Sequence, residues 1–296
     1  MKISRRDFLK GSATTLFLAG FNFPVFASSS RKKNLVVIML RGGMDGLTAV
    51  PVIGDQNFEK RREKILIENP IKLNSDFALH PRLDAFHQCW KENTGSIIHA
   101  TSIPYTARSH FEGQNLMESG GKVPYQEKTG WLGRGMKLAN LKGEGLSLSL
   151  PMPLLLRGVP KNNNYYPSGG KLPGEDTLDL LKSIYADSSE EELLDMMNFI
   201  KKRKSEEMMN YNPYADNTNN RNLAQQAAGY LKEPDGPSVA VFEVNGFDTH
   251  AAQGGVDGTH TRCLVEMDDI IRYLKTYLKE SYKDTIILTV TEFGRT

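Results

Sequence analysis

One run of apolar residues limits the folds that are open to this chain. Residues 34–40 (Asn-Leu-Val-Val-Ile-Met-Leu) are almost unbroken in their apolar character, have the length of a strand, and lead into Arg41-Gly42-Gly43. A strand that is apolar on both faces is typical of the centre of a parallel sheet, where helices cover both sides. The run therefore predicts a buried parallel strand that ends in a sharp turn.

Further strand-like runs alternate with helical patterns along the chain. Strands are expected at 96–100, 238–244 and 284–290, and two short extended pieces at 146–157. Alternating strands and helices predict an α/β fold with a doubly wound, mostly parallel sheet. Helices are expected at 55–64, 81–92, 109–119, 131–140 and 256–282, with a polar loop at 162–170 and a charged helical insertion at about 175–232.

The first residues have the pattern of an export signal. Ser4-Arg5-Arg6-Asp7-Phe8-Leu9-Lys10 matches the twin-arginine motif, an apolar run follows, and Val25-Phe26-Ala27 offers small residues to a signal peptidase. The run is too short and too interrupted to span a bilayer. The alternative is a cytosolic protein with a basic N-terminal helix. The order of the features favours a cleaved signal at 1–27, with the twin-arginine machinery and signal peptidase as partners, and a periplasmic or secreted domain at 28–296.

The net charge and the two cysteines limit what can be expected of the mature chain. Of 37 basic and 35 acidic residues, four basic and one acidic lie in the signal, so 33 basic and 34 acidic remain, a net charge of −1. This balance predicts no nucleic-acid partner. The sequence has no second long apolar run, so we expect no stable membrane span. Cys89 and Cys263 could pair outside the cytoplasm or remain as buried free thiols.

The turn after the first strand is the first candidate for chemistry. In Arg41-Gly42-Gly43-Met44-Asp45-Gly46, the glycines expose backbone N–H groups, Asp45 offers a carboxylate to a metal, and Arg41 offers a cation to an oxyanion. The spacing is not that of a nucleotide-binding loop. The alternative is a tight turn in which the aspartate has its common turn role.

A second candidate begins a predicted helix. Ser109 at a helix N-terminus suits a nucleophile, and Arg108 and His110 beside it suit a phosphate-like or sulfate-like group. Ser109 and Glu112 also have the spacing of a capping box, which explains both residues without any chemistry.

Two further candidates follow the later strands. Asp248 and His250, in Asn-Gly-Phe-Asp-Thr-His, carry donors suited to zinc or another divalent ion, and Glu292 lies in Thr-Glu-Phe-Gly-Arg. The alternative interpretation is that Asp248 is an ordinary turn aspartate and that the other side chains lie on the surface without binding a metal. Because functional groups gather at the carboxyl ends of parallel strands, we expect Asp45, Ser109 and these residues to share one rim of the sheet. His80, His87, His99 and His260 are expected to be packed or solvent-facing.

Six motifs follow one another along the chain: Leu-Arg-Gly-Gly-Met-Asp-Gly-Leu (40–47), Ala-Leu-His-Pro (78–81), Tyr-Thr-Ala-Arg-Ser-His-Phe-Glu (105–112), Gly-Trp-Leu-Gly-Arg (130–134), Phe-Asp-Thr-His (247–250) and Thr-Glu-Phe-Gly-Arg-Thr (291–296). In this order they are similar to those of the twin-arginine-exported family known as domain of unknown function 1501. The likeness covers nearly the whole mature chain. It implies an alkaline-phosphatase-like or sulfatase-like α/β fold and, by analogy, divalent metals that handle a phosphate or sulfate ester.

Carried over by motif, the resemblance implies metal-side roles for Asp45, Asp248, His250 and Glu292, with zinc, manganese or calcium as the ion. It implies a nucleophile region at Ser109 and anion contacts at Arg41 and Arg108, which are the catalytic candidates. The chain departs from alkaline phosphatases in carrying Arg41 where those enzymes place a metal-binding aspartate.

Three hypotheses remain open from the sequence. The first is a metal-dependent hydrolase of phosphate or sulfate esters. The second is a non-catalytic exported protein that binds an anionic envelope polymer or a partner. The third is an inactive, C-terminally truncated fragment, because a buried-type strand runs into a polar loop where the family continues to an Asp-His-Gly stretch.

Overall fold

The computed structural model describes most of the predicted α/β domain. It covers residues 32–139, 141, 145–149, 151–158, 162–165, 175–185, 197–198, 220–250 and 253–294. The predicted export signal at 1–27 and the middle of the predicted insertion lie outside the described residues.

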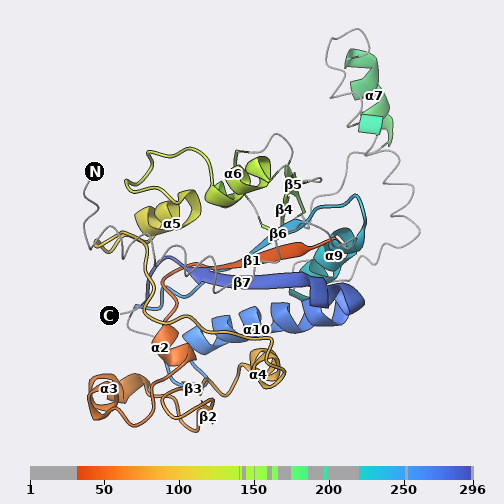
Figure 1. The fold of residues 1–296 in the computed structure, drawn as a ribbon. Helices are drawn as coiled ribbons and strands as arrows, with labels where there is room; N and C mark the ends of the chain where they lie inside the picture. The colour runs from red at the N-terminus through yellow and green to blue at the C-terminus, as the bar shows by residue number, and fades with distance from the viewer. Residues whose placement is uncertain are drawn as a thin grey trace, which may run out of the picture.

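Strands and helices alternate along the chain, as the apolar pattern predicts (Figure 1). The strands are β1 (Asn34–Leu40), β2 (Ile71–Lys72), β3 (Ala78–Leu79), β4 (Gly145–Ser147), β5 (Asn162–Asn164), β6 (Val239–Val244) and β7 (Thr285–Thr291). The helices are α2 (Gly46–Ala49), α3 (Gln56–Arg62), α4 (Asp84–Lys91), α5 (His110–Ser119), α6 (Trp131–Leu138), α7 (Glu175–Tyr185), α9 (Asn220–Lys232) and α10 (Thr259–Leu278), with 3-10 turns η1 (Glu63–Ile65), η2 (Leu154–Leu156) and η3 (Lys279–Asp284).

The main sheet has five strands in the order β5-β4-β6-β1-β7, and every neighbouring pair is parallel. β1 lies between β6 and β7, with Leu40 opposite Val244 on one side and Thr291 on the other. The expected mostly parallel α/β sheet is therefore confirmed. The carboxyl ends of β6, β1 and β7 are level with one another, which brings the loops that follow them to one edge.

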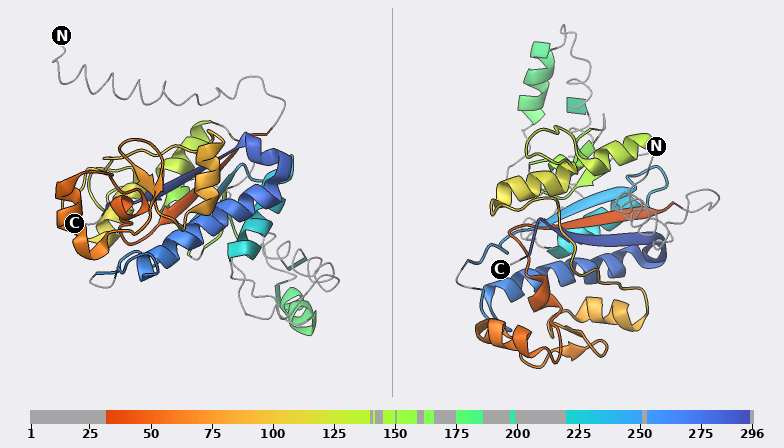
Figure 2. Two further views of the ribbon diagram at one scale, coloured as in Figure 1. Left: turned by 90° about the horizontal axis from the view of Figure 1, so that it is seen from below. Right: turned by 60° about the vertical axis from the view of Figure 1, so that its left-hand side comes forward.

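Side chains of β1 alternate between two apolar cores, one on each face of the sheet. Val36, Ile38 and Leu40 pack with α9 and α10 in the larger core. Val37 and Met39 pack with side chains of α5, α6 and η2 on the opposite face. In the right-hand view of Figure 2, α5 and α6 lie above the sheet and α10 lies below it. Because a strand of this kind is buried on both sides, its sequence has no polar alternation.

Helix α5 connects this framework to the candidate site, and its ends are set by local chemistry. The Oγ atom of Ser109 accepts a hydrogen bond from the backbone N–H of Glu112, and Gly120 ends the helix in a left-handed conformation with φ of 66°. A side-chain acceptor at the start and a glycine after the last turn are the expected helix boundaries. They fix where His110, the first residue of the helix, lies.

The structure corrects two predicted elements. Residues 96–100 form no strand, and His99 instead stacks on Phe77 with ring centroids 4.4 Å apart. Residues 162–164, expected within a polar loop, form strand β5 beside β4. Side-chain polarity does not prevent strand pairing at a sheet edge, because the backbone supplies the hydrogen bonds. Asn162 strengthens this pairing through its Oδ1, which accepts a hydrogen bond from the backbone N–H of Gly145 in β4 at 3.2 Å.

The predicted 175–232 insertion contains two helices with different surroundings. Helix α7 stands away from the sheet in Figures 1 and 2, whereas α9 packs against α10 and β6 as part of the larger core. The second extended piece expected within 146–157 is the 3-10 turn η2, and the first is β4. Cys89 and Cys263 are buried free thiols.

Among the described residues, none of the helices has both the length and the apolar character that a bilayer crossing requires.

Candidate functional site

The loops after β1, β6 and β7 meet the start of α5 at one edge of the sheet. Gly42, at φ of 111°, lies so close to the loop after β6 that an added Cβ would be 2.3 Å from the backbone nitrogen of Asp248. An added Cβ on Gly43 would be 3.2 Å from Cε1 of His110 and 3.1 Å from Cε2 of Phe293. Both glycines have positive φ, which side chains disfavour, so the sequence Gly-Gly is required for this close approach.

Glu292, directly after β7, is a buried carboxylate that gathers three donors on one oxygen. Its Oε1 accepts hydrogen bonds from the backbone N–H of Gly42 at 2.9 Å, from Gln114 Nε2 at 3.0 Å and from His110 Nδ1 at 3.0 Å. Burial opposes ionisation, but the bonds from Gln114 and His110 outweigh it and lower the pKa of Glu292. An ionised carboxylate can only accept, so Nδ1 of His110 donates to Glu292 and Nε2 is the ring nitrogen that faces Asp248.

Asp248, after β6, lies between two imidazoles. Its Oδ1 is 3.3 Å from Nε2 of His110, and its Oδ2 is 3.4 Å from Nε2 of His250. The side chains of Asp248 and His250 are 43% and 83% exposed, so both face solvent at the rim. His250 has φ of 43°, an uncommon value for a residue with a side chain. Such conformations recur at functional sites.

The ring of His110 is held from its side as well as through Nδ1. Phe293 packs against it with ring centroids 4.7 Å apart. An added Cβ on Gly113, on the next turn of α5, would be 3.0 Å from the same phenyl ring. The histidine is thus enclosed by Phe293 on one side while Nε2 points towards Asp248.

Arg41, predicted to contact an anionic ligand, is paired with protein carboxylates. Its guanidinium lies 2.6 Å from Glu243 and 2.9 Å from Glu118, and it donates a bond of 3.0 Å to Gln114. Burial acts to lower the pKa of Arg41, but the bond to Glu243 and the charge of Glu118 outweigh it and raise that pKa. Gln114 forms hydrogen bonds with both Arg41 and Glu292, so it links the guanidinium to the buried carboxylate of the site.

Asp45, predicted as a metal-side residue, belongs to a separate buried network. Its carboxylate forms an ion pair with Arg62 and accepts hydrogen bonds from Thr48 Oγ1 at 2.6 Å and Gln253 Nε2 at 2.7 Å. Burial would raise the pKa of Asp45, but these three partners lower it. The backbone N–H of Asp45 donates to Nε2 of His260, at 3.0 Å. Asp45 thereby joins the turn after β1 to α3 and to the start of α10.

Ser109 caps α5. The return contact of the capping box, from the Glu112 side chain to the backbone N–H of Ser109, is bridged by the hydroxyl of Tyr105. The backbone N–H of Ser109 donates to the hydroxyl of Tyr105 at 3.0 Å, and that hydroxyl donates to Glu112 at 2.6 Å. The bond to Ser109 Oγ is long, at 3.4 Å. Arg108, one residue earlier, is exposed and forms no hydrogen bond or ion pair with the described residues. It is a cation available to an anionic ligand.

His80 is buried and held in its neutral form. Its Nδ1 accepts from the backbone N–H of Arg82 at 3.2 Å, and its Nε2 lies 3.1 Å from Thr261 Oγ1. Burial, with the charge of Arg82, lowers its pKa to about 4. His80 therefore has a packed structural role.

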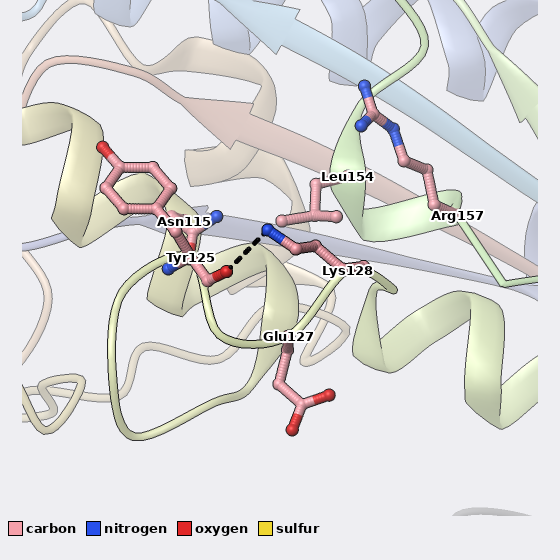
Figure 3. A pocket seen from close by; sticks show the side chains of 6 residues that line it. All are labelled: Asn115, Tyr125, Glu127, Lys128, Leu154 and Arg157. Atoms are coloured by element: carbon pink, nitrogen blue, oxygen red, sulfur yellow. Dashed lines mark hydrogen bonds between the residues drawn. The ribbon is translucent and has the colours of Figure 1, made fainter.

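A surface hollow among the described residues shares none of its lining residues with this edge. It holds about 240 Å³ beside α5 and η2, and Figure 3 shows Lys128 turned towards the carbonyl of Tyr125, to which it donates a bond of 2.9 Å. The hollow is lined by Asn115, Tyr125, Glu127, Lys128, Leu154 and Arg157.

Of the predicted site residues, the structure brings Glu292, Asp248 and His250 together through His110. It places Arg41 behind them and Asp45 in the network with Arg62. Within the described stretches, no three His, Cys, Asp or Glu side chains already form a metal-sized group. His110 is the residue that sequence reasoning undervalued. Its signal was its place beside Ser109 in the 105–112 motif.

The fold and the edge define an α/β protein with a carboxylate–imidazole cluster at the carboxyl ends of three neighbouring parallel strands. A family model described as "Protein of unknown function (DUF1501)" matches residues 93–296, and the chain belongs to that family. The match includes α5, β6 and β7 with their site residues. Comparisons with curated proteins and with solved structures found no match.

Proposed function

We propose that this protein is an exported, metal-dependent hydrolase of phosphate or sulfate esters, related in fold to alkaline phosphatases and sulfatases. The carrying observation is Asp248, an exposed carboxylate with an imidazole nitrogen 3.3 Å and 3.4 Å from its two oxygens. Carboxylate and imidazole donors at a sheet edge suit zinc or manganese, and less well calcium, which prefers oxygen ligands.

Each residue of the edge has a distinct task in this proposal. Asp248 and His250 would hold the ion. A divalent ion in this place would polarise the ester and lower the pKa of a bound water. Arg108, exposed and without an ion pair among the described residues, binds the anionic group of the substrate. Ser109 presents its hydroxyl at the N-terminus of α5, where backbone N–H groups stabilise negative charge.

The twin-arginine motif at residues 4–10 supports the exported location. Export in the folded state allows a metal to be loaded before the protein leaves the cytoplasm. We propose that cleavage near Ala27 releases the mature chain to the periplasm or the medium. N-terminal sequencing of the mature protein tests this, and an intact N-terminus in the cytoplasmic fraction contradicts it.

The test of the activity uses the full chain, expressed with its own signal. We expect close to one equivalent of zinc or manganese in the purified protein and hydrolysis of an aryl phosphate or an aryl sulfate. Both are lost in Asp248→Ala and kept in Asp76→Ala, which changes an aspartate on an exposed loop. A folded protein that hydrolyses neither ester with any of the three metals contradicts the proposal.

A non-catalytic binding protein is the second candidate. It is favoured by Ser109, whose hydroxyl already caps α5, and by the pairing of Arg41 with Glu118 and Glu243. In that case the exposed Arg108 would bind an anionic envelope polymer without turnover. Retention of such a polymer by the wild-type protein, with Arg108→Ala releasing it and no ester hydrolysed, distinguishes this candidate from the hydrolase.

A further inference from the structure

We propose that Nε2 of His110 is a protein ligand of the metal, together with Asp248 and His250, and that Glu292 positions His110 instead of binding the ion. This assignment deepens the proposed function and rests on it. It exchanges the roles that the sequence motifs suggest, because Glu292 was expected to be a ligand and His110 was not.

The first argument is the spacing of the donor atoms. Zinc lies about 2.0–2.2 Å from imidazole nitrogens and carboxylate oxygens, so adjacent donors of a tetrahedral ion are separated by about 3.4 Å. Nε2 of His110 and Nε2 of His250 lie 3.3 Å and 3.4 Å from the oxygens of Asp248. Charge-assisted N–H···O bonds are shorter, at about 2.7–2.9 Å. Both contacts thus have the separation of two ligands on one ion.

The second argument is that the oxygens of Glu292 are already committed. Its Oε1 accepts from Gly42, His110 and Gln114, and its Oε2 lies 3.1 Å from the hydroxyl of Thr291. The residue is 1% exposed. A metal on Glu292 would have to displace donors that have no other described acceptor at this place.

The third argument is the orientation of His110. Histidines that bind metals usually donate their other ring nitrogen to a carboxylate or carbonyl, which fixes the tautomer and raises the basicity of the ligand. Glu292 accepts from Nδ1 in this way, and Phe293 holds the ring plane. Gln114 extends the support to Arg41, with bonds of 3.0 Å on each of its sides.

The three ligands are not yet gathered around one point, because the two imidazoles approach different oxygens of Asp248. His250 is the ligand that completes the site on binding. Its side chain is 83% exposed and is free to turn, whereas His110 is held at 26% exposure by Glu292 and Phe293. We therefore expect the ion to meet His110 and Asp248 first.

The experiment measures binding of Zn²⁺ to the metal-free full chain, by competition with a chromogenic chelator. His110→Asn is the informative variant, because asparagine places an N–H donor where Nδ1 donates to Glu292 but has no atom at Nε2. We expect His110→Asn to weaken binding at least 100-fold, and Glu292→Gln to weaken it by about 10-fold to 100-fold, the range typical of residues that support a ligand from outside. His87→Ala, which removes a histidine on α4, leaves binding unchanged.

Cobalt substitution separates a ligand from a supporting residue. With bound Co²⁺, loss of an imidazole ligand changes the intensity of the visible absorption bands. We expect this change in His110→Asn and the wild-type spectrum in Glu292→Gln at saturating Co²⁺. Circular dichroism of both variants checks that the fold is kept, and His110→Gln serves as a second removal of the imidazole if His110→Asn does not fold.

The outcomes separate this inference from the proposed function. Wild-type binding that survives in His110→Asn but disappears in Glu292→Gln makes Glu292 the ligand and overturns the inference, while the hydrolase proposal stands. Absence of Zn²⁺, Mn²⁺ and Ca²⁺ binding by the folded wild-type chain overturns both.

Discussion

The carboxylate of Glu292 accepts a hydrogen bond from Nδ1 of His110 at 3.0 Å, and this contact joins the end of β7 to the first residue of α5. Together with the bond from Gln114 it lowers the pKa of Glu292, and it makes Nδ1 of His110 a donor. Because Glu292 is buried with three donors on one oxygen, the contact contributes to stability as well as to the site.

The first prediction concerns the acid stability that Glu292 contributes. Its folded pKa lies below the ordinary glutamate value of about 4.3, so the carboxylate stabilises the fold above that pH and loses this contribution as the pH falls through the folded pKa. Glu292→Gln is expected to cost about 1–3 kcal/mol at pH 7, because it removes the charge from three buried donors. Urea unfolding at pH 7 and pH 3.5 measures both effects. A cost that is equal at the two pH values contradicts the prediction.

The second prediction concerns His80, whose pKa is lowered to about 4 by burial. The unfolded chain binds this proton near pH 6.5 and the folded chain does not, so stability falls as the pH is lowered from about 6.5 towards about 4. The loss attributable to His80 approaches roughly 3 kcal/mol at the lower limit. His80→Gln should flatten the pH dependence of the unfolding free energy within this window. Unchanged pH dependence in that variant is the contrary result.

The third prediction separates the two roles of Ser109. Ser109→Ala removes the cap of α5 and should cost about 1 kcal/mol, whereas Ser109→Asn supplies another good cap and should cost little. If the hydroxyl is the nucleophile, both variants lose ester hydrolysis although only one is destabilised. Thermal unfolding and turnover are measured on the same samples. Full turnover in Ser109→Asn would restrict Ser109 to its capping role.

The fourth prediction tests the close approach of the loops after β1 and β6. Gly42→Ala would place a Cβ 2.3 Å from the backbone nitrogen of Asp248, at a φ of 111° that alanine disfavours. We expect a loss of about 1–3 kcal/mol from the strained backbone, with weaker Zn²⁺ binding because Asp248 must move. Gly46→Ala is the matched control, since an added Cβ there meets nothing within 4 Å. Equal stability of the two variants refutes the argument.

The fifth prediction concerns the buried pair of Asp45 and Arg62. Arg62→Met leaves the Asp45 carboxylate without its cation and is expected to cost about 3–5 kcal/mol. Arg61→Met, on an exposed neighbour in the same helix, should be close to neutral. Chemical denaturation of the two variants gives the comparison. If metal binding also persists in Arg62→Met, the Asp45 network is separate from the site in function as well as in geometry.

The elements that could be read from the sequence are those with strong local signals. β1, β6 and β7 are apolar runs of strand length, and α5 has both a capping serine and a terminating glycine. β5 was missed because three asparagines carry no apolar signal, and their pairing with β4 depends on a neighbour elsewhere in the chain.

The site was predicted only in part, because some of its contacts follow from the topology of the sheet and others depend on residues far away in the chain. The convergence of Asp248, His250 and Glu292 follows from parallel topology, which the alternating pattern predicts. The partners of Arg41 and Asp45 do not follow from it. Glu243 and Gln253 are some 200 positions away in the chain, and no local pattern indicates that they will occupy a cation or a carboxylate.

The position of β1 between β6 and β7 has a consequence for synthesis of the chain. Leu35 pairs with Val239 on one side and Ile286 on the other, so the most apolar strand leaves the ribosome long before either neighbour exists. Until then, the two hydrogen-bonding edges and the two apolar faces of β1 need protection from other nascent polypeptides. Assembly of the sheet centre, and of the carboxylate–imidazole cluster at its rim, must therefore wait until β6 and β7 have been synthesised.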